Sequence, residues 1–136
     1  MQLLTTDSQS HREDEKDQRT APIIGAAIDV HRHLGPGLLE SAYAQCLCHE
    51  PHLRGLPFQY QIDLPVSYKG IKLDCGYKID LIVSNEVIVE LKAIERILPV
   101  HEAQLLTYLK LSGKPVGLLI NFNVSLLTRG IIRRVL

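Results

Sequence analysis

The sequence predicts a single α/β domain in which one mixed β-sheet is flanked by helices. Three observations support this fold class. Apolar residues recur at helical spacing across residues 21–50, whereas residues 58–92 alternate between apolar and polar side chains, as half-buried strands do. A second helical pattern at residues 99–112 is followed at 116–122 by an almost wholly apolar run, which is typical of a strand covered on both faces.

Two helices are expected at the start of the domain. Residues 21–34 carry apolar side chains at the spacing of one helix face, and the Gly-Pro-Gly sequence at 35–37 should end this helix. A second helix is expected to begin near Leu38. Pro51 should end or kink it, because proline lacks the N–H that a helix interior requires.

A β-hairpin is expected next. Residues 58–68 alternate between apolar and polar side chains, and Pro65 favours an edge position or a bulge for this strand. Lys69-Gly70 favours a tight turn. Residues 71–80 then alternate again, with Asp80 on the polar face of this second strand.

The second half of the chain continues the same sheet. A further turn precedes a third strand at residues 86–92. Pro99 should begin a helix that ends at Gly113, and residues 116–122 form the covered strand. The last segment, residues 125–136, can add a final strand. The expected order is therefore α-α-β-β-β-α-β with a short tail piece.

The charge distribution restricts the partners that the chain can have. Fifteen basic and fifteen acidic residues give a formal net charge of zero, which argues against a protein that coats nucleic acid by bulk electrostatics. Residues 1–19 hold five acids, three bases and no apolar periodicity, so we expect a disordered tail there and one domain at residues 20–136. The remaining twelve bases and ten acids permit a nucleic-acid partner.

The composition also indicates a compartment. No apolar run reaches the roughly eighteen residues that a membrane span needs, and the N-terminal residues lack an apolar stretch of signal-peptide length. The odd set of Cys46, Cys48 and Cys75 fits a reducing compartment better than a disulfide framework, and its spacing favours small buried side chains over a zinc site. We therefore expect a cytoplasmic protein without a membrane partner.

The third strand carries the first chemical signal. Alternation places Glu90 and Lys92 on one face of this otherwise apolar strand. Burying a carboxylate and an amine is costly unless they pair or the carboxylate binds a cation. A Glu-x-Lys triplet is a weak signal by itself, since chance produces one in roughly one chain in three of this size.

Asp80 makes the signal more specific, because it lies in the neighbouring strand of the same hairpin. A two-residue loop at Ser84-Asn85 would pair Asp80 with Val89 and put Glu90 on the opposite face. A three-residue loop that includes Glu86 pairs Asp80 with Glu90 directly. A site built from both acids therefore requires an odd loop or a bulge.

Two aligned carboxylates would repel each other by about 1–4 kcal/mol at roughly 4 Å, and a divalent cation would turn this repulsion into attraction. Oxygen ligands suit Mg²⁺ or Mn²⁺. Lys92 could then orient a water, help to deprotonate it or steady the charge of a scissile phosphate. The alternative, equally consistent with the hairpin alone, is a cross-strand salt-bridge cluster.

Three sequence patterns resemble one known family. Asp80 followed after nine residues by Glu90-Leu91-Lys92 resembles the PD-(D/E)XK nuclease superfamily. Residues 37–43 read GLLESAY and match the motif that names its GxxExxY group, and residues 104–108 read QLLTY and match the QxxxY motif of its RecB-like branch. The resemblance runs from about Ile23 to the C-terminus. It implies a restriction-endonuclease-like α-β-β-β-α-β core, in agreement with the expected order of elements.

The resemblance also implies roles for individual residues. Asp80 and Glu90 would be metal ligands, with the Leu91 backbone carbonyl completing the metal shell, and Glu40 would add a carboxylate near the metal. Lys92 would be the catalytic lysine. The chain departs from the superfamily's pattern at Ile79, which stands in place of a proline that supplies no ligand.

The resemblance further implies that Gln104 and Tyr108 contact substrate or orient the lysine; they lie on one helix face at positions i and i+4. Structural alternatives remain open. Glu40 could be a solvated helix residue, and Tyr43 and Tyr108 could simply pack in the core. The histidines show no arrangement typical of a metal site and are expected at surface or half-buried positions. His101 is a remote candidate for substrate contact.

Two functions follow. The first is a Mg²⁺- or Mn²⁺-dependent nuclease that hydrolyses phosphodiester bonds of nucleic acid, with DNA as the expected substrate. The second is a binding module on the same fold, which holds nucleic acid or a protein without cutting a bond. So small a domain has little surface to grip a duplex, and a homodimer or larger complex would enlarge it.

Overall fold

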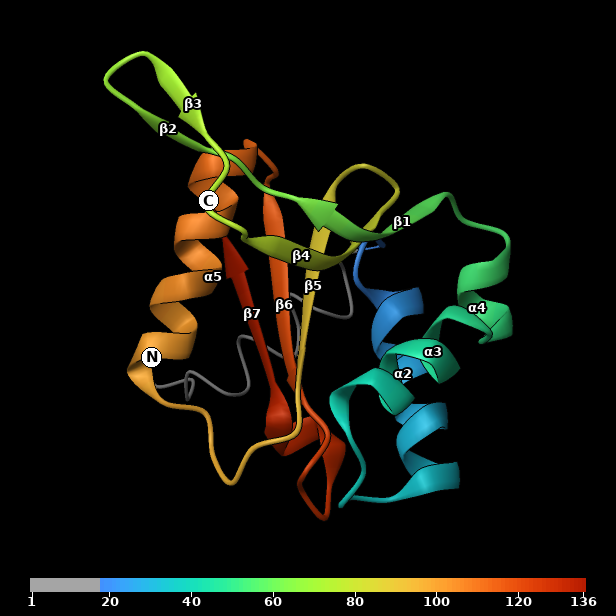
Figure 1. The fold of residues 1–136 in the computed structure, drawn as a ribbon. Helices are drawn as coiled ribbons and strands as arrows, with labels where there is room; N and C mark the ends of the chain where they lie inside the picture. Colours follow the sequence, from blue (N-terminus) through green and yellow to red (C-terminus); the bar gives the residue numbers. More distant parts are fainter. Residues whose placement is uncertain (1–17) are drawn as a thin grey trace, which may run out of the picture.

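The computed structural model describes residues 18–136, and the expected tail at 1–19 lies almost wholly outside this range. A five-stranded sheet separates α5 from α2–α4, which lie on its opposite faces (Figure 1). The elements in chain order are α2 (Ala21–Leu34), α3 (Glu40–Cys48), α4 (Pro51–Arg54), β1 (Phe58–Asp63), β2 (Val66–Tyr68), β3 (Ile71–Leu73), β4 (Lys78–Val83), β5 (Val87–Lys92), α5 (Pro99–Ser112), β6 (Val116–Asn121), the 3-10 helix η1 (Leu127–Gly130) and β7 (Ile131–Val135).

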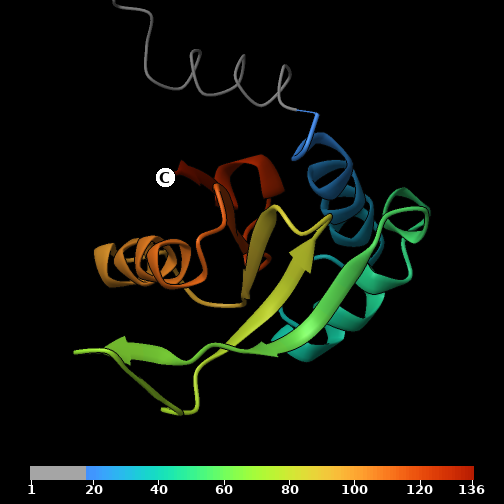
Figure 2. The same cartoon turned by 90° about the horizontal axis from the view of Figure 1, so that it is seen from above.

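The main sheet has the strand order β1-β4-β5-β6-β7. Its β5–β6 pair is parallel and the other pairs are antiparallel, so the sheet is mixed, as predicted. The parallel pair requires a crossover, and α5 supplies it across one face (Figure 2). β1 is an edge strand, which agrees with the position expected from Pro65.

The expected first hairpin is divided into two parts. Its outer part forms a separate two-stranded sheet, β2–β3, which projects beyond the main sheet (Figure 1). The tight turn at Lys69-Gly70 is confirmed, because both residues have positive φ and Tyr68 pairs with Ile71. The prediction of one sheet is therefore wrong for this segment. Pro65 cannot donate to a ladder, and the turn around Gly76 bends the returning strand.

Tyr43 holds the loop between α2 and α3. Its side chain is fully buried, and its ring stacks on that of Phe122 with 4.4 Å between the ring centroids. The Tyr43 hydroxyl donates to the Gly35 carbonyl at 2.6 Å and accepts from the Leu38 N–H at 3.2 Å. These contacts fix the loop that leads into α3, and they agree with the core-packing interpretation of Tyr43.

Helix α5 has defined ends. The Leu98 N–H donates to Nδ1 of His101 at 2.8 Å, so His101 caps the first turn. Gly113 ends the helix in the left-handed conformation, at the residue that the sequence predicts. Within residues 18–136, no helix has the length and apolar character that crossing a membrane would require.

The core has two parts, one on each face of the sheet. Alternate residues of β4–β6 pack against α2, α3 and α4 on one face, and the intervening residues pack against α5 on the other. Every residue of β6 is buried, as predicted from its apolar sequence. The three cysteines are free; Cys46 and Cys48 are half-buried against the first part of the core, whereas Cys75 is exposed.

Candidate active site

The loop between β4 and β5 has the odd length that a two-acid site requires. Val83 pairs with Val87, so residues 84–86 form a three-residue loop. Ser84 and Asn85 both have positive φ, and the Glu86 N–H donates to the Val83 carbonyl at 3.1 Å. Continuing the register beyond the Leu81–Val89 pair places Asp80 opposite Glu90.

Side chains replace backbone hydrogen bonds at this point of the sheet. The Asp80 N–H donates to Oε2 of Glu90 at 2.8 Å, and the Leu91 N–H donates to Oδ2 of Asp80 at 2.8 Å. The regular β4–β5 ladder covers only residues 81–83 and 87–89. The two carboxylates therefore lie between the strands, and each is held by the backbone of the other strand.

Burial and the charges of neighbouring acids disfavour the ionised forms of both Asp80 and Glu90. Glu90 is 5% exposed; burial, followed by the charge of Asp80, raises the pKa of its carboxyl to about 8, although the Asp80 N–H and Lys92 act in the opposite direction. The pKa of Asp80 is raised mainly by burial and further by the charge of Glu40, against the Leu91 N–H and Lys92. A divalent cation would relieve this repulsion directly.

A pocket of about 210 Å³ opens beside Asp80. Glu40 enters it from the first turn of α3, while Glu90 is not among its lining residues. The lining residues are Glu40, Ser41, Ala44, Tyr60, Gln61, Asp80 and Leu91. Glu40 and Asp80 therefore share a solvent-accessible cavity, as a site with an additional carboxylate requires.

Lys92 lies at the end of β5, where the chain leaves the sheet. Its charge lowers the pKa of both Asp80 and Glu90, so it lies within electrostatic reach of both acids. Its backbone carbonyl accepts the Phe122 N–H at 2.9 Å, which fixes its position beside the end of β6. The structure thus groups Asp80, Glu90, Leu91 and Lys92 at one end of the β4–β5 pair.

Asn121 lies beside Lys92 and was not among the candidate residues that the sequence predicts. It is 1% exposed and pairs with Lys92 in the parallel ladder. Its side chain accepts from the Ile94 N–H at 3.1 Å and donates to the Ile94 carbonyl at 3.0 Å. The sequence does hold one signal for Asn121, because it is a single amide at the end of an otherwise apolar strand. A buried amide needs hydrogen-bond partners, and a segment of chain leaving the sheet can supply them.

Gln104 and Tyr108 lie on α5 and do not line the pocket. Nε2 of Gln104 donates to the Tyr108 hydroxyl at 3.2 Å. Tyr108 is 5% exposed, and its pKa is raised by burial first and then by the charge of Glu90. The Tyr108 ring packs in the core, in agreement with the core-packing alternative for this residue. Its hydroxyl lies within electrostatic reach of Glu90 and Asp80.

The donor set fits a hard divalent cation. Asp80 and Glu90 each use one carboxylate oxygen to accept a backbone N–H, and within residues 18–136 the other oxygen accepts no hydrogen bond. Neither of those oxygens is a fully buried atom without a partner. Carboxylate oxygens are the ligands that Mg²⁺ or Mn²⁺ prefers, although among the described residues Glu40, Asp80 and Glu90 do not bring one ligand atom each within 4.8 Å of one another.

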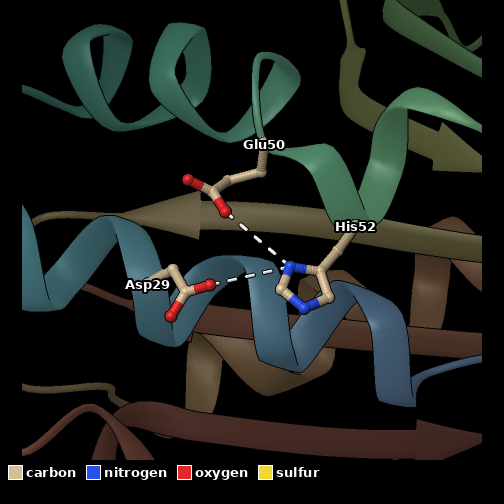
Figure 3. Close-up of side chains that lie close together, drawn as sticks. All are labelled: Asp29, Glu50 and His52. Carbon is tan, nitrogen blue, oxygen red and sulfur yellow. Dashed lines mark ion pairs between the residues drawn. The ribbon is translucent and has the colours of Figure 1, made fainter.

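A second group of metal-ligating side chains lies elsewhere, on α2 and at the start of α4. Nδ1 of His52 is 3.6 Å from Oδ2 of Asp29 and 3.8 Å from Oε1 of Glu50 (Figure 3). One ligand atom from each residue lies within 4.8 Å of the others, so this group could also hold a metal ion. The expectation that no histidine takes part in such an arrangement is therefore wrong for His52, which the fold brings beside α2.

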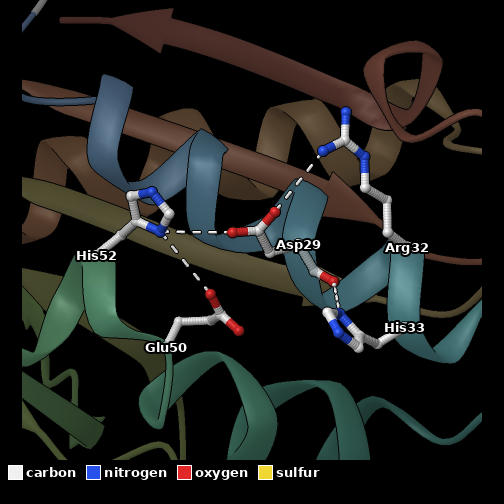
Figure 4. Close-up of polar contacts among 5 residues, drawn as sticks. All are labelled: Asp29, Arg32, His33, Glu50 and His52. Atoms are coloured by element: carbon white, nitrogen blue, oxygen red, sulfur yellow. Dashed lines mark hydrogen bonds and ion pairs between the residues drawn. The ribbon is translucent and has the colours of Figure 1, made fainter.

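The contacts around this second group are those of an ion-pair network. Arg32 lies 3.8 Å from Oδ1 of Asp29, and Nδ1 of His33 is 2.8 Å from the Asp29 backbone carbonyl (Figure 4). A cation already competes for Asp29, and none of the three members lines the pocket at Asp80. His31 also departs from expectation, because it is buried and its Nε2 lies 2.7 Å from the Val124 carbonyl.

Comparison with known proteins gives one match. A family model described as the PD-(D/E)XK nuclease superfamily matches residues 17–135, which is nearly the whole chain. No curated protein and no solved structure gives a significant match.

Proposed function

Since the chain belongs to the PD-(D/E)XK nuclease superfamily, we propose that it is a Mg²⁺- or Mn²⁺-dependent phosphodiesterase that hydrolyses nucleic acid, with DNA as the expected substrate. One observation carries the proposal. Asp80 and Glu90 lie opposite each other, each holds the other strand's backbone at 2.8 Å, and Lys92 lies within reach of both. The pKa of Glu90, raised to about 8, supports a functional centre, because strongly shifted carboxyl groups are concentrated at such sites.

The metal would be held by Asp80, Glu90 and the Leu91 carbonyl, with Glu40 as an additional carboxylate. When bound, a divalent cation supplies a Lewis acid that activates water and offsets the charge developing on a phosphate. The chain's own contribution is to hold the carboxylates in place before the cation arrives. The two reciprocal hydrogen bonds do this, since rotation of either acid breaks a contact to the opposite strand.

Lys92 would steady the negative charge of the scissile phosphate or accept a proton from the attacking water. Its position depends on the end of β6, where Phe122 and Asn121 hold the chain on both sides of it. Gln104 and Tyr108 would support the same centre from α5, with the Tyr108 hydroxyl directed by Gln104.

The proposal includes the GxxExxY group within the superfamily. Glu40, the acid of that motif, lines the pocket together with Asp80, and Tyr43 fixes the loop that presents Glu40. Three free cysteines support a reducing, cytoplasmic location. A homodimer or larger complex would provide additional surface for the nucleic acid.

The test is metal-dependent cleavage of labelled DNA by the purified chain. Asp80→Asn and Glu90→Gln keep the size and the hydrogen-bond acceptors of the acids, and Lys92→Ala removes the amine. Each should lower cleavage by at least about a hundredfold while circular dichroism remains that of the parent. The matched control is Asp29→Asn in the second group, which should cleave like the parent.

If the three site variants keep full activity, or if only Asp29→Asn abolishes it, the assignment of this centre is wrong. A folded parent that neither binds Mg²⁺ or Mn²⁺ in calorimetry nor cleaves nucleic acid would favour the non-catalytic binding module instead.

A further inference from the structure

Gln61 has an unusual backbone for a residue within a strand. Its φ is +57°, in the left-handed region that residues with a Cβ avoid. The other non-glycine residues with positive φ in the described chain, Lys69, Ser84 and Asn85, lie in hairpin turns that require this conformation. Gln61 lies in β1 and lacks that explanation. Such strain persists only where the surrounding structure enforces it, and it is concentrated at active sites and ligand-binding sites.

The position of this kink is specific. Tyr60 pairs with Leu81 and Ile62 pairs with Ile79, but the ladder has no pair between Gln61 and Asp80. The strained residue therefore lies opposite the candidate metal ligand. The kink interrupts the edge strand beside Asp80, next to the pocket that Asp80 lines.

The kink also changes which side chains face the pocket. Neighbouring residues of a regular strand point to opposite faces of the sheet. Tyr60 and Gln61 are neighbours, yet both line the pocket that contains Asp80. The left-handed residue thus brings two neighbouring residues, Tyr60 and Gln61, to the same pocket beside Asp80.

Tyr60 is more exposed than its place in the sequence pattern predicts. It belongs to the apolar face of β1, but it is 44% exposed, whereas Phe58 and Ile62 are partly buried. Among the described residues no other aromatic ring packs against it. An unstacked aromatic ring beside a phosphodiesterase centre is a platform for a planar ligand.

We infer that Tyr60 and Gln61 bind an unpaired nucleotide next to the scissile phosphate, so that the substrate class is single-stranded or locally unpaired nucleic acid. A base stacks on Tyr60, and the Gln61 amide hydrogen-bonds its edge or the adjoining sugar-phosphate. A base inside a duplex has both faces covered by its neighbours, so it cannot stack on the ring without leaving the helix. This inference rests on the proposed function for the identity of the ligand.

The experiment measures binding separately from cleavage. Lys92→Ala keeps the proposed metal ligands and should slow cleavage by at least about a hundredfold, so in this background with Mg²⁺ the nucleic acid stays intact during a binding measurement. Fluorescence anisotropy gives the Kd for a labelled single-stranded oligonucleotide and for the duplex with its complement. We expect tighter binding of the single strand. Adding Tyr60→Ala should weaken single-strand binding about tenfold, whereas Tyr60→Phe should preserve it, because stacking needs the ring and not the hydroxyl.

Tyr68→Ala is the matched control, since Tyr68 is also an exposed tyrosine but lies on β2, outside the pocket. Gln61→Gly gives a second readout. Glycine adopts positive φ without strain, so this variant should melt at the same temperature as the parent or higher while single-strand binding weakens. Equal loss in Tyr60→Ala and Tyr68→Ala, a parent that prefers duplex, or a Gln61→Gly variant that melts lower without a binding defect would each overturn the inference.

The two proposals can fail separately. A wild-type chain that cleaves while Tyr60→Ala and Gln61→Gly bind and cleave normally refutes the recognition pair and keeps the nuclease. Tyr60-dependent single-strand binding without cleavage by the wild type refutes the nuclease and keeps the recognition pair.

Discussion

Asp80 and Glu90 exchange the roles that backbone groups have elsewhere in the sheet: the Asp80 N–H binds the Glu90 carboxylate at 2.8 Å, and the Asp80 carboxylate binds the N–H that follows Glu90 at the same distance. The two acids therefore belong to the framework of the sheet as well as to the candidate centre. Changes in their charge should affect folding and metal binding together.

The stability of the metal-free protein should fall as the pH rises. Glu90 has a pKa raised from its ordinary value of 4.5 to about 8, so the folded state binds its proton more tightly than the unfolded chain does. The resulting stabilisation is fully present below pH 4.5 and is lost as the pH rises to about 8. Urea unfolding with EDTA between these values measures it. Glu90→Gln should flatten the slope and raise the midpoint at the alkaline end; an unchanged slope in this variant would assign the effect to another group.

Metal binding should release protons, and the affinity for the metal should increase as the pH rises. Because a cation binds the ionised carboxylates, its affinity should increase by up to about tenfold per pH unit until Glu90 is ionised, near pH 8. Calorimetry with Mn²⁺ in two buffers of different ionisation enthalpy measures the released protons. Glu90→Gln should reduce that number, whereas Asp29→Asn should not; proton release that depends on Asp29 would place the metal in the second group.

The length of the β4–β5 loop should decide whether the centre exists. Deleting Glu86 leaves a two-residue loop, which moves Glu90 to the opposite face of the sheet or forces the chain to refold. We expect loss of metal binding and a marked fall in the melting temperature. Glu86→Ala is the control, because Glu86 is exposed and its replacement keeps the loop length. A deletion variant that binds metal like the parent would contradict the register.

Asn121 should position Lys92 without touching the substrate. Asn121→Ala removes two hydrogen bonds to Ile94 and leaves the Ile94 N–H without its acceptor, at a cost of about 1–3 kcal/mol. We expect kcat to fall more than KM rises, since the lysine moves while the pocket remains. Asn123→Ala is a milder change, because the Asn123 side chain makes only a 3.4 Å contact with the Ile94 carbonyl. Equal effects of the two changes on kcat would remove Asn121 from the positioning role.

Two substitutions of Tyr108 should separate the packing role of its ring from the contribution of its hydroxyl to cleavage. Tyr108→Phe keeps the buried ring and loses only the hydroxyl that Gln104 contacts, so stability should change by less than about 1.5 kcal/mol while cleavage declines. Tyr108→Ala removes the ring and should cost about 3–5 kcal/mol. Unfolding curves and cleavage rates measured on both variants check this. A Tyr108→Phe variant with normal cleavage would leave only the packing role.

The sequence by itself determined the kind and order of most elements. Helical spacing before Gly35 and the apolar run of β6 are local patterns that appear in the structure with nearly the expected bounds, whereas the alternating residues 58–68 and 71–80 are divided among β1, β2, β3 and β4. The sequence also stated the condition for the site: an odd loop after Val83. It could not choose between two and three loop residues, because both satisfy the local turn preferences, and the choice depends on how the strands pack against two separate cores.

Tertiary structure decided what depends on contacts between distant segments. The kink at Gln61 lies where the β1–β4 ladder lacks a pair, the buried amide of Asn121 contacts Ile94 across the parallel pair, and His52 meets Asp29 only because α4 packs on α2. No repeating pattern in the sequence predicts these three features, because the residues involved are far apart along the chain and meet only in the folded structure. Local patterns therefore predict the elements, and packing sets which side chains meet between them.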